Sequence, residues 1–94
     1  MATNNNIKPT TILHPGATLS AELKARHWTQ AELSRRTGKP YQAISEIIRG
    51  KKAITAEFAV VLERVLGTSA ELWLRMEADY RLHLARGKAR KRNG

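Results

Sequence analysis

Residues 29–50, TQAELSRRTGKPYQAISEIIRG, contain two short apolar segments separated by a single glycine. Thr29 and Glu32 have the spacing of a capping box, in which each side chain satisfies a free backbone N–H of the other residue, so a helix is expected to begin directly after Thr29. Gly38 is expected to end this helix. Pro40 cannot continue it but is well suited to begin another. The segment therefore predicts two short helices joined by a tight turn.

The remainder of the chain predicts three more helices and no strand. A proline suits the first turn of a helix over about residues 15–26, and Thr55 caps a strongly apolar helix. Thr68 and Glu71 form a second capping box, from which a last helix is expected to run to about Arg86. The centre of the expected core consists of Phe58, Ala59, Val61, Leu62, Val65 and Leu66. The fold class is thus all-α with five helices.

Length and composition favour one small domain with two polar ends. A chain of 94 residues has room for one modest core. Residues 1–12 are expected to be a flexible arm, residues 13–86 the folded domain, and residues 87–94 a disordered basic tail. The sequence has no cysteine, no signal-like start and no long apolar window. We therefore expect a soluble protein in a reducing cytoplasm, without contact to a membrane.

Positive charge is concentrated beside the expected turn. The 17 Lys and Arg residues against eight Asp and Glu give a net charge of +9, which favours nucleic acid or an acidic protein as a partner. Between residues 35 and 52, Glu46 is the only acidic residue. The basic residues of that segment are Arg35, Arg36, Lys39, Arg49, Lys51 and Lys52. Such a cluster on a folded segment predicts a surface that binds phosphate groups.

Two short helices with a glycine-containing turn match the helix-turn-helix pattern, in which the second helix enters the major groove of DNA. Ile44 and Ile47 are expected to face inward. The outward side chains that we expect to contact bases are Tyr41, Gln42, Ser45 and Glu46. Gln42 can make a bidentate contact to adenine. Glu46 has two open roles: it accepts from a cytosine amino group, or it pairs with Arg49 or Lys39.

Phosphate contacts are expected on both sides of these base contacts. Gln30 would lie at the free N–H groups of a helix start, where the helix dipole attracts an anion. Arg49, Lys51 and Lys52 would contact the strand beyond the second helix of the motif, and Arg35 and Lys39 belong to the same basic cluster.

The last helix carries two apolar stripes, and a small domain rarely needs both. One stripe consists of Trp73, Met76, Tyr80 and Leu84 and is expected to cover the core. The other consists of Leu74, Ala78, Leu82 and Ala85, and we expect it to form the interface of a homodimer. The open alternative is that both stripes pack within one chain.

Catalysis is not expected. His14, His27 and His83 lie far apart in the sequence, lack a metal-binding spacing and have no cysteine companions. No nucleophile and base converge, so neither a metal, a cofactor nor a small-molecule substrate is expected. Trp28 and Trp73 are interpreted as packing residues rather than as stacking platforms for single-stranded nucleic acid.

The stretch QAELSRRTGKPYQAISEIIRGKKAIT resembles phage-repressor-type helix-turn-helix regulators. With HPG at 14–16, ISEIIRGKKAIT from 44 and LGTSAELWLRMEADYRL from 66, the chain over about residues 12–85 looks like a HigA-type antitoxin. The resemblance places the recognition-helix positions at Pro40, Tyr41, Gln42, Ser45 and Glu46, with Gln30 at a phosphate. Pro40 replaces the usual hydroxyl cap and is expected beside the phosphate backbone.

The resemblance implies an antitoxin that neutralises a RelE-like (HigB-type) mRNA endonuclease. It also implies a homodimer that binds an inverted-repeat operator in double-stranded DNA and represses its own operon. Two alternatives stay open from the sequence. One is a free-standing repressor without a toxin, and the other is a basic protein that binds nucleic acid without sequence preference.

Overall fold

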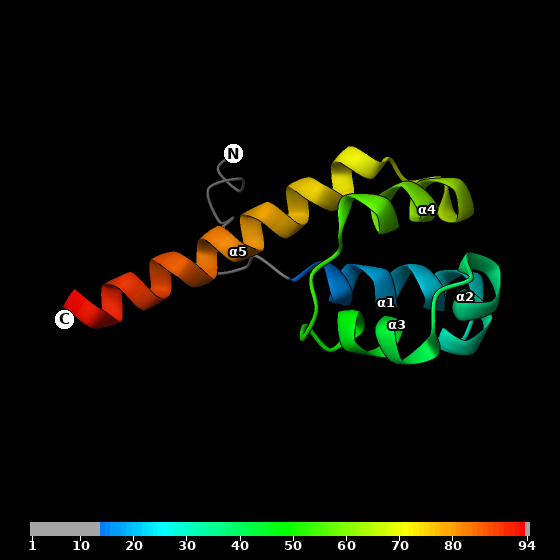
Figure 1. Ribbon diagram of the computed structural model, residues 1–94, viewed down its shortest axis with the longest axis horizontal. Helices are drawn as coiled ribbons and strands as arrows, with labels where there is room; N and C mark the ends of the chain where they lie inside the picture. Colours follow the sequence, from blue (N-terminus) through cyan, green and yellow to red (C-terminus); the bar gives the residue numbers. More distant parts are fainter. Residues whose placement is uncertain (1–13, 94) are drawn as a thin grey trace, which may run out of the picture.

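The computed structural model describes residues 14–93, with side chains to residue 89. Within this range the chain forms five α-helices and no strand, as the sequence predicted. The helices are α1 (Pro15–Arg26), α2 (Gln30–Thr37), α3 (Tyr41–Ile48), α4 (Ala56–Leu66) and α5 (Ala70–Asn93). Figure 1 shows α1 to α4 gathered in one body, from which the second half of α5 projects. The arm predicted for residues 1–12 lies outside the described residues.

Hydroxyl caps begin two of the helices at the predicted places. The Thr29 hydroxyl accepts from the Glu32 N–H at 3.0 Å, and the Thr55 hydroxyl accepts from the Phe58 N–H at 3.1 Å. Only half of the first capping box forms, because the Glu32 carboxylate accepts hydrogen bonds from Arg35 and Arg36. The nearby guanidinium groups are stronger partners for the carboxylate than a neutral backbone N–H.

The predicted cap of α5 is wrong by one residue. The Ser69 hydroxyl accepts from the Leu72 N–H at 3.0 Å, so Ser69 caps the helix. Thr68 instead accepts a hydrogen bond of 2.7 Å from the indole N–H of Trp73. Trp73 is fully buried, and a buried indole N–H requires an acceptor. Because the Thr68 hydroxyl accepts the Trp73 indole N–H, Ser69 rather than Thr68 caps α5.

The predicted end of α5 at Arg86 is also wrong, as is the predicted disorder of the basic tail over residues 87–93. The helix continues through Gly87 to Asn93. A glycine within a helix costs about 1 kcal/mol relative to alanine. Lys88, Ala89 and the Arg and Lys residues that follow them in the sequence are strong helix formers, and they offset this cost. A single glycine without a following proline is a weak stop signal.

The core lies where the five helices meet. Its buried residues are Leu19, Leu23, Leu33, Ile44, Ile47, Ile54, Phe58, Ala59, Leu62, Leu66 and Trp73. One acidic side chain, Glu77 of α5, is buried with them. Its carboxylate accepts from the Ile54 N–H at 2.9 Å and from Arg81, so it joins α5 to the loop before α4. No helix within residues 14–93 combines the length and apolar character needed to cross a membrane.

Gly16 allows the start of α1 to touch α3. A Cβ atom at this position would lie 2.0 Å from the carbonyl oxygen of Ile47 and 2.8 Å from the Cα of Ile48. Both neighbours are backbone atoms, which cannot move away as a flexible side chain can. The absence of a side chain at residue 16 therefore sets the distance between α1 and α3.

We predict that Gly16→Ala lowers the free energy of unfolding by about 1–3 kcal/mol, because an added methyl group forces α1 and α3 apart. Chemical denaturation followed by circular dichroism measures the effect. Gly87→Ala is the matched control, since a Cβ there meets no atom within 4 Å. It should cost no stability and can add up to about 1 kcal/mol. Equal gains for both variants would contradict the close approach at Gly16.

Candidate nucleic-acid interface

The orientation of α3 is fixed by the side chains that it buries. Ile44 is 0% exposed and Ile47 is 6% exposed, and α3 packs against both α1 and α2. Leu33 of α2 is also fully buried. The expectation that the two isoleucines face inward is confirmed. Because they occupy one side of the helix, the opposite side is presented to solvent.

The turn between α2 and α3 depends on Gly38 and on two hydroxyl groups. Gly38 has φ 77° and ψ 4°, in the left-handed region. Its N–H donates to the Ser34 carbonyl at 2.9 Å, while the Ser34 hydroxyl donates to the Lys39 carbonyl at 2.6 Å. The Thr37 hydroxyl accepts from the Lys39 N–H at 3.2 Å. The hydrogen bonds of Ser34 were not predicted from the sequence, although a serine one turn before a glycine can indicate a hydroxyl that closes the turn.

We predict that Gly38→Ala lowers the free energy of unfolding by about 1–2 kcal/mol, the cost of a left-handed conformation for a residue with a Cβ. Steric contact cannot explain such a loss, because a Cβ at Gly38 would meet nothing within 4 Å. Gly38→Asn is the control, since asparagine tolerates this conformation and should recover much of the loss. Thermal and urea unfolding of the three proteins check the order. An asparagine variant as unstable as the alanine variant would contradict this explanation.

The four predicted base-contact residues share one side of α3. Tyr41 is 53% exposed, Gln42 is exposed, and Ser45 and Glu46 are half-buried. Positions 41, 42, 45 and 46 are neighbours on a helical surface because residues four apart lie one turn from each other. The structure thus places the four side chains together on the solvent side of the helix.

Glu46 has different partners from those predicted. Its carboxylate accepts from the Gln42 side-chain amide at 3.2 Å and lies 3.7 Å from the Lys52 ammonium. The predicted pairing with Arg49 or Lys39 is wrong. Arg49 donates to the Ser45 carbonyl at 3.3 Å, and the Lys39 ammonium lies 5.7 Å from the centroid of the Phe58 ring. The loop after α3 folds back and brings Lys52 to Glu46, which helix spacing alone does not predict.

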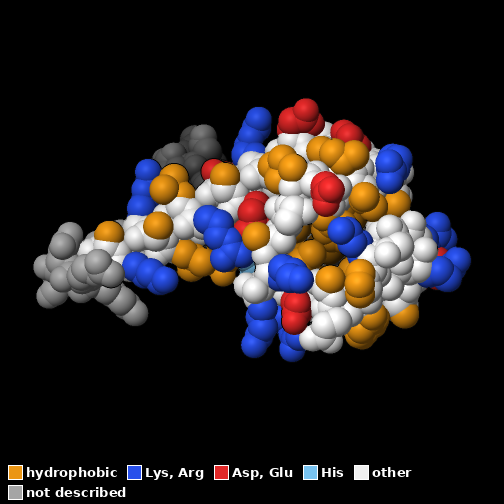
Figure 2. Space-filling model, viewed as in Figure 1, with side chains coloured by type: hydrophobic (Ala, Val, Ile, Leu, Met, Phe, Trp, Pro, Cys, Tyr) orange, Lys and Arg blue, Asp and Glu red, His pale blue; other side chains and the backbone are white. Residues whose placement is uncertain are grey.

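The predicted phosphate contacts surround this side of α3. Pro40, Arg49, Lys51 and Lys52 are exposed, and Lys39 is half-buried. Gln30 is the first residue of α2, and its side-chain oxygen is buried without a hydrogen-bond partner among the described residues. Figure 2 shows several Lys or Arg side chains along the lower edge of the view, where Figure 1 places the end of α3 and the loop after it.

Two arginines of the basic cluster are already engaged on α2. Hydrogen bonds from Arg35 and Arg36 lower the pKa of the Glu32 carboxyl below its ordinary value. The same bond to Glu32 raises the pKa of Arg35. Arg36 also lies over the Trp28 ring, 4.0 Å from its centroid, so it holds the end of α2 against the residues that follow α1. Arg35 stays largely exposed, with 71% of its side chain accessible.

The second apolar stripe of α5 divides into two parts. Leu74 packs partly buried against the core, whereas Ala78, Leu82 and Ala85 are exposed. The alternative that both stripes pack within one chain is therefore wrong for the second half of the helix. The first stripe also reaches solvent at Leu84, because α5 extends beyond the body that it covers. Sequence periodicity identified the stripes but not the point at which the core ends.

The described histidines are not gathered into one site, although the His14 ring lies beside Gly50, just after the end of α3. His14 precedes α1, and its ring packs against Tyr80 with centroids 5.6 Å apart. His27 ends α1 in a left-handed conformation, with φ 60°. Within the described part of the chain, no three His, Asp or Glu residues are arranged to hold a metal ion.

The fold and this exposed face of α3 define a helix-turn-helix protein. The helix-turn-helix family profile matches residues 19–73, more than half of the chain. Virulence-associated protein A of Dichelobacter nodosus is 38% identical over 71 residues, which cover 73% of this chain and 70% of that protein. The chain therefore belongs to the helix-turn-helix family.

Comparison with solved structures identifies a narrower group within this family. An addiction module antidote protein of the HigA family from Coxiella burnetii superposes with a TM-score of 0.80 at 29% identity, covering 86% of this chain and 89% of that chain. Antitoxin HigA of Pseudomonas aeruginosa, solved with the higBA promoter, gives 0.81 and 29%, with coverage of 86% and 89%. The expected resemblance to HigA-type antitoxins is confirmed.

Proposed function

We propose that this chain is an antitoxin and autorepressor that binds its operator as a homodimer. In this proposal α3 enters the major groove, and Tyr41, Gln42, Ser45 and Glu46 face the bases. The observation that carries the proposal is the burial of Ile44 and Ile47, which leaves this set on the outer side of a fixed helix. The Pseudomonas aeruginosa antitoxin was solved with the higBA promoter, which supports promoter DNA as the partner in this proposal.

The contact between Gln42 and Glu46 is compatible with base reading. A glutamine amide has two N–H donors and one oxygen acceptor. One donor is used by Glu46 at 3.2 Å, which leaves the second donor and the oxygen for the N7 and N6 atoms of an adenine. Glu46, itself held by Lys52, therefore acts in this proposal as an orienting residue for Gln42. We assign the phosphate contacts to Gln30, Arg35, Lys39, Pro40, Arg49, Lys51 and Lys52.

We predict that Gln42→Ala weakens binding to the operator by about 1–3 kcal/mol and leaves binding to a random duplex unchanged. Lys51→Ala should weaken binding to both duplexes and reduce the salt slope by about 1, because it removes a phosphate contact without base information. Fluorescence anisotropy at several salt concentrations measures both, after footprinting on DNA upstream of the gene. Equal affinity of the native protein for the two duplexes would favour the alternative of binding without sequence preference.

The proposed homodimer uses the exposed part of α5, at Ala78, Leu82 and Ala85. An operator with two half-sites about 34 Å apart requires two copies of α3 in successive major grooves. Two such copies need a fixed separation, which an interface along a long helix provides. Leu74 lies at the edge of this interface, since it already packs on the core.

We predict that Leu82→Lys converts the dimer into a monomer, because it places a charge in an apolar contact. Leu72→Lys is the matched control: Leu72 is 43% exposed and Leu82 is 47% exposed on the same helix, but Leu72 is outside the proposed interface. Sedimentation equilibrium distinguishes the two states. A native protein that stays monomeric at the concentrations used for DNA binding would disprove this interface.

The partner in the antitoxin role is a RelE-like toxin. The HigA-type structures support a toxin as the partner, because one of these proteins is an antidote protein of an addiction module and another is an antitoxin. Co-expression with the product of the adjacent gene tests it: the pair should co-purify, and this chain should relieve growth arrest by the neighbour. A repressor whose neighbours encode no such toxin would fit the free-standing alternative.

A further inference from the structure

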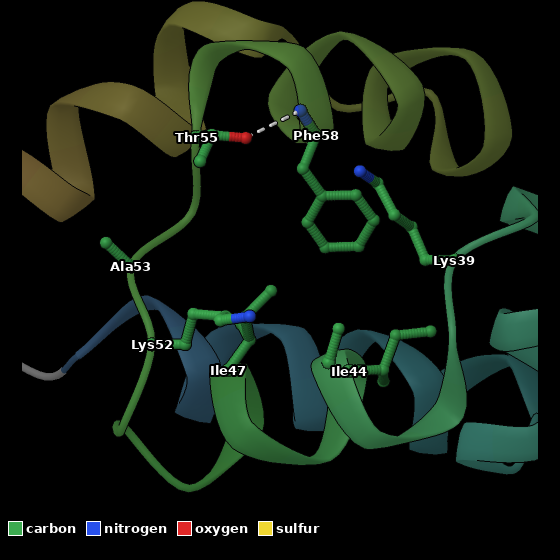
Figure 3. A pocket seen from close by; sticks show the side chains of 8 residues that line it. Lys39, Ile44, Ile47, Lys52, Ala53, Thr55 and Phe58 are labelled. Carbon is green, nitrogen blue, oxygen red and sulfur yellow. Dashed lines mark hydrogen bonds between the residues drawn. The ribbon is translucent and has the colours of Figure 1, made fainter.

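A hollow with an apolar floor opens between α3 and α4. Its volume is about 170 Å³, and it is open to solvent on one side. Ile44 and Ile47 of α3 and Phe58 of α4 form the floor (Figure 3), and each is almost fully buried. Ala43 and Ala53 line the hollow with short side chains, which leave the space unfilled.

Two ammonium groups reach this apolar floor from opposite sides. Figure 3 shows the side chains of Lys39 and Lys52 extending into the hollow. The Lys52 ammonium lies 3.7 Å from the Glu46 carboxylate, and the Lys39 ammonium lies 5.7 Å from the centroid of the Phe58 ring. Among the side chains that the structure describes, Lys39 takes part in no ion pair within 4 Å. A full positive charge is therefore held beside apolar surface without an anion.

We propose that this hollow binds a small apolar monocarboxylate of about the size of benzoate. The apolar body would lie on Ile44, Ile47 and Phe58, and the carboxylate would lie between Lys39 and Lys52. Cavities of about 150 Å³ lined by Leu, Ile and Phe bind benzene, so the volume suits one ring. Pockets for drug-sized ligands are larger, about 300–1,000 Å³.

Thr55 adds a third polar group to the same wall. Its oxygen accepts from the Phe58 N–H at 3.1 Å. A hydroxyl that accepts one hydrogen bond still has its own O–H to donate, so Thr55 can donate to a carboxylate oxygen. The site thus combines an apolar floor with a few convergent donors, which is the usual composition of a ligand pocket. A specific protein partner would instead need a total of about 1,000 Å² of buried surface, of which this hollow would be one small part.

The ligand would oppose DNA binding. This consequence rests on the proposed function, in which Lys39 and Lys52 contact phosphates. A carboxylate that engages both ammonium groups removes two phosphate contacts, so the salt slope of DNA binding should fall by about 2 in the presence of saturating ligand. Ligand binding is measured without DNA. A failure of the ligand proposal can therefore be distinguished from a failure of the proposed DNA-binding function.

The test is a titration of the full chain, labelled with nitrogen-15, with sodium benzoate at constant ionic strength. We expect the amide resonances of Ala43, Ile47, Ala53 and Phe58 to shift with a dissociation constant on the order of 1 mM, as suits so small a ligand. Benzamide, which has the ring without the charge, and acetate, which has the charge without the ring, should bind about tenfold more weakly or not at all.

Lys39→Gln should weaken benzoate binding about fivefold or more, and the exposed Lys51→Gln should not, since Lys51 does not line the hollow. Both are substitutions of lysines outside the core, so neither should disturb the fold. Three results would overturn the proposal: no benzoate shifts up to the solubility limit, equal losses for the two variants, or equal affinity for benzoate and acetate. Shifts of the same resonances by a purified toxin partner without any response to benzoate would make the hollow a protein contact instead.

Discussion

The packing of α3 against α1 and α2 is the interaction on which the rest of this surface depends. Ile44 and Ile47 are buried on one side of α3, and Gly16 allows the start of α1 to reach its backbone. Rotation of α3 about its own axis would expose these isoleucines to water and bury polar groups in their place. Both changes raise the free energy of the folded state. The apolar contacts therefore determine which polar residues of α3 face outward.

Local patterns in the sequence were sufficient to predict most of the helices and their ends. Thr29, Gly38 and Thr55 mark helix ends through hydrogen bonds and backbone conformation within a few residues, so each is readable without the tertiary structure. The errors arose where two local signals competed for the same position. Thr68 bonds to the Trp73 indole instead of capping α5. Gly87 does not end a helix whose following residues favour helix formation.

The sequence predicted which residues of the candidate interface lie together, but not which of them contact one another. Helix spacing alone was enough to group Tyr41, Gln42, Ser45 and Glu46. The contact of Glu46 with Lys52 was not predictable, because it depends on how the loop after α3 returns toward the helix. The hollow between α3 and α4 could not be predicted from the sequence either. Its walls come from two stretches of chain, residues 39–47 and 52–58, and its volume depends on the short side chains of Ala43 and Ala53.

The hydrogen bond between Glu77 and the Ile54 N–H links α5 to the loop after α3. At about 1.5 Å per residue, the 24 residues of α5 form a rod about 36 Å long, and only its first half rests on the body. The helix continues without a break from the part that rests on the body into the projecting half. Glu77, in the first half, accepts the Ile54 N–H just beyond Lys51 and Lys52 in the same loop. A single hydrogen bond thus joins the long projecting helix to the loop whose lysines lie beside α3.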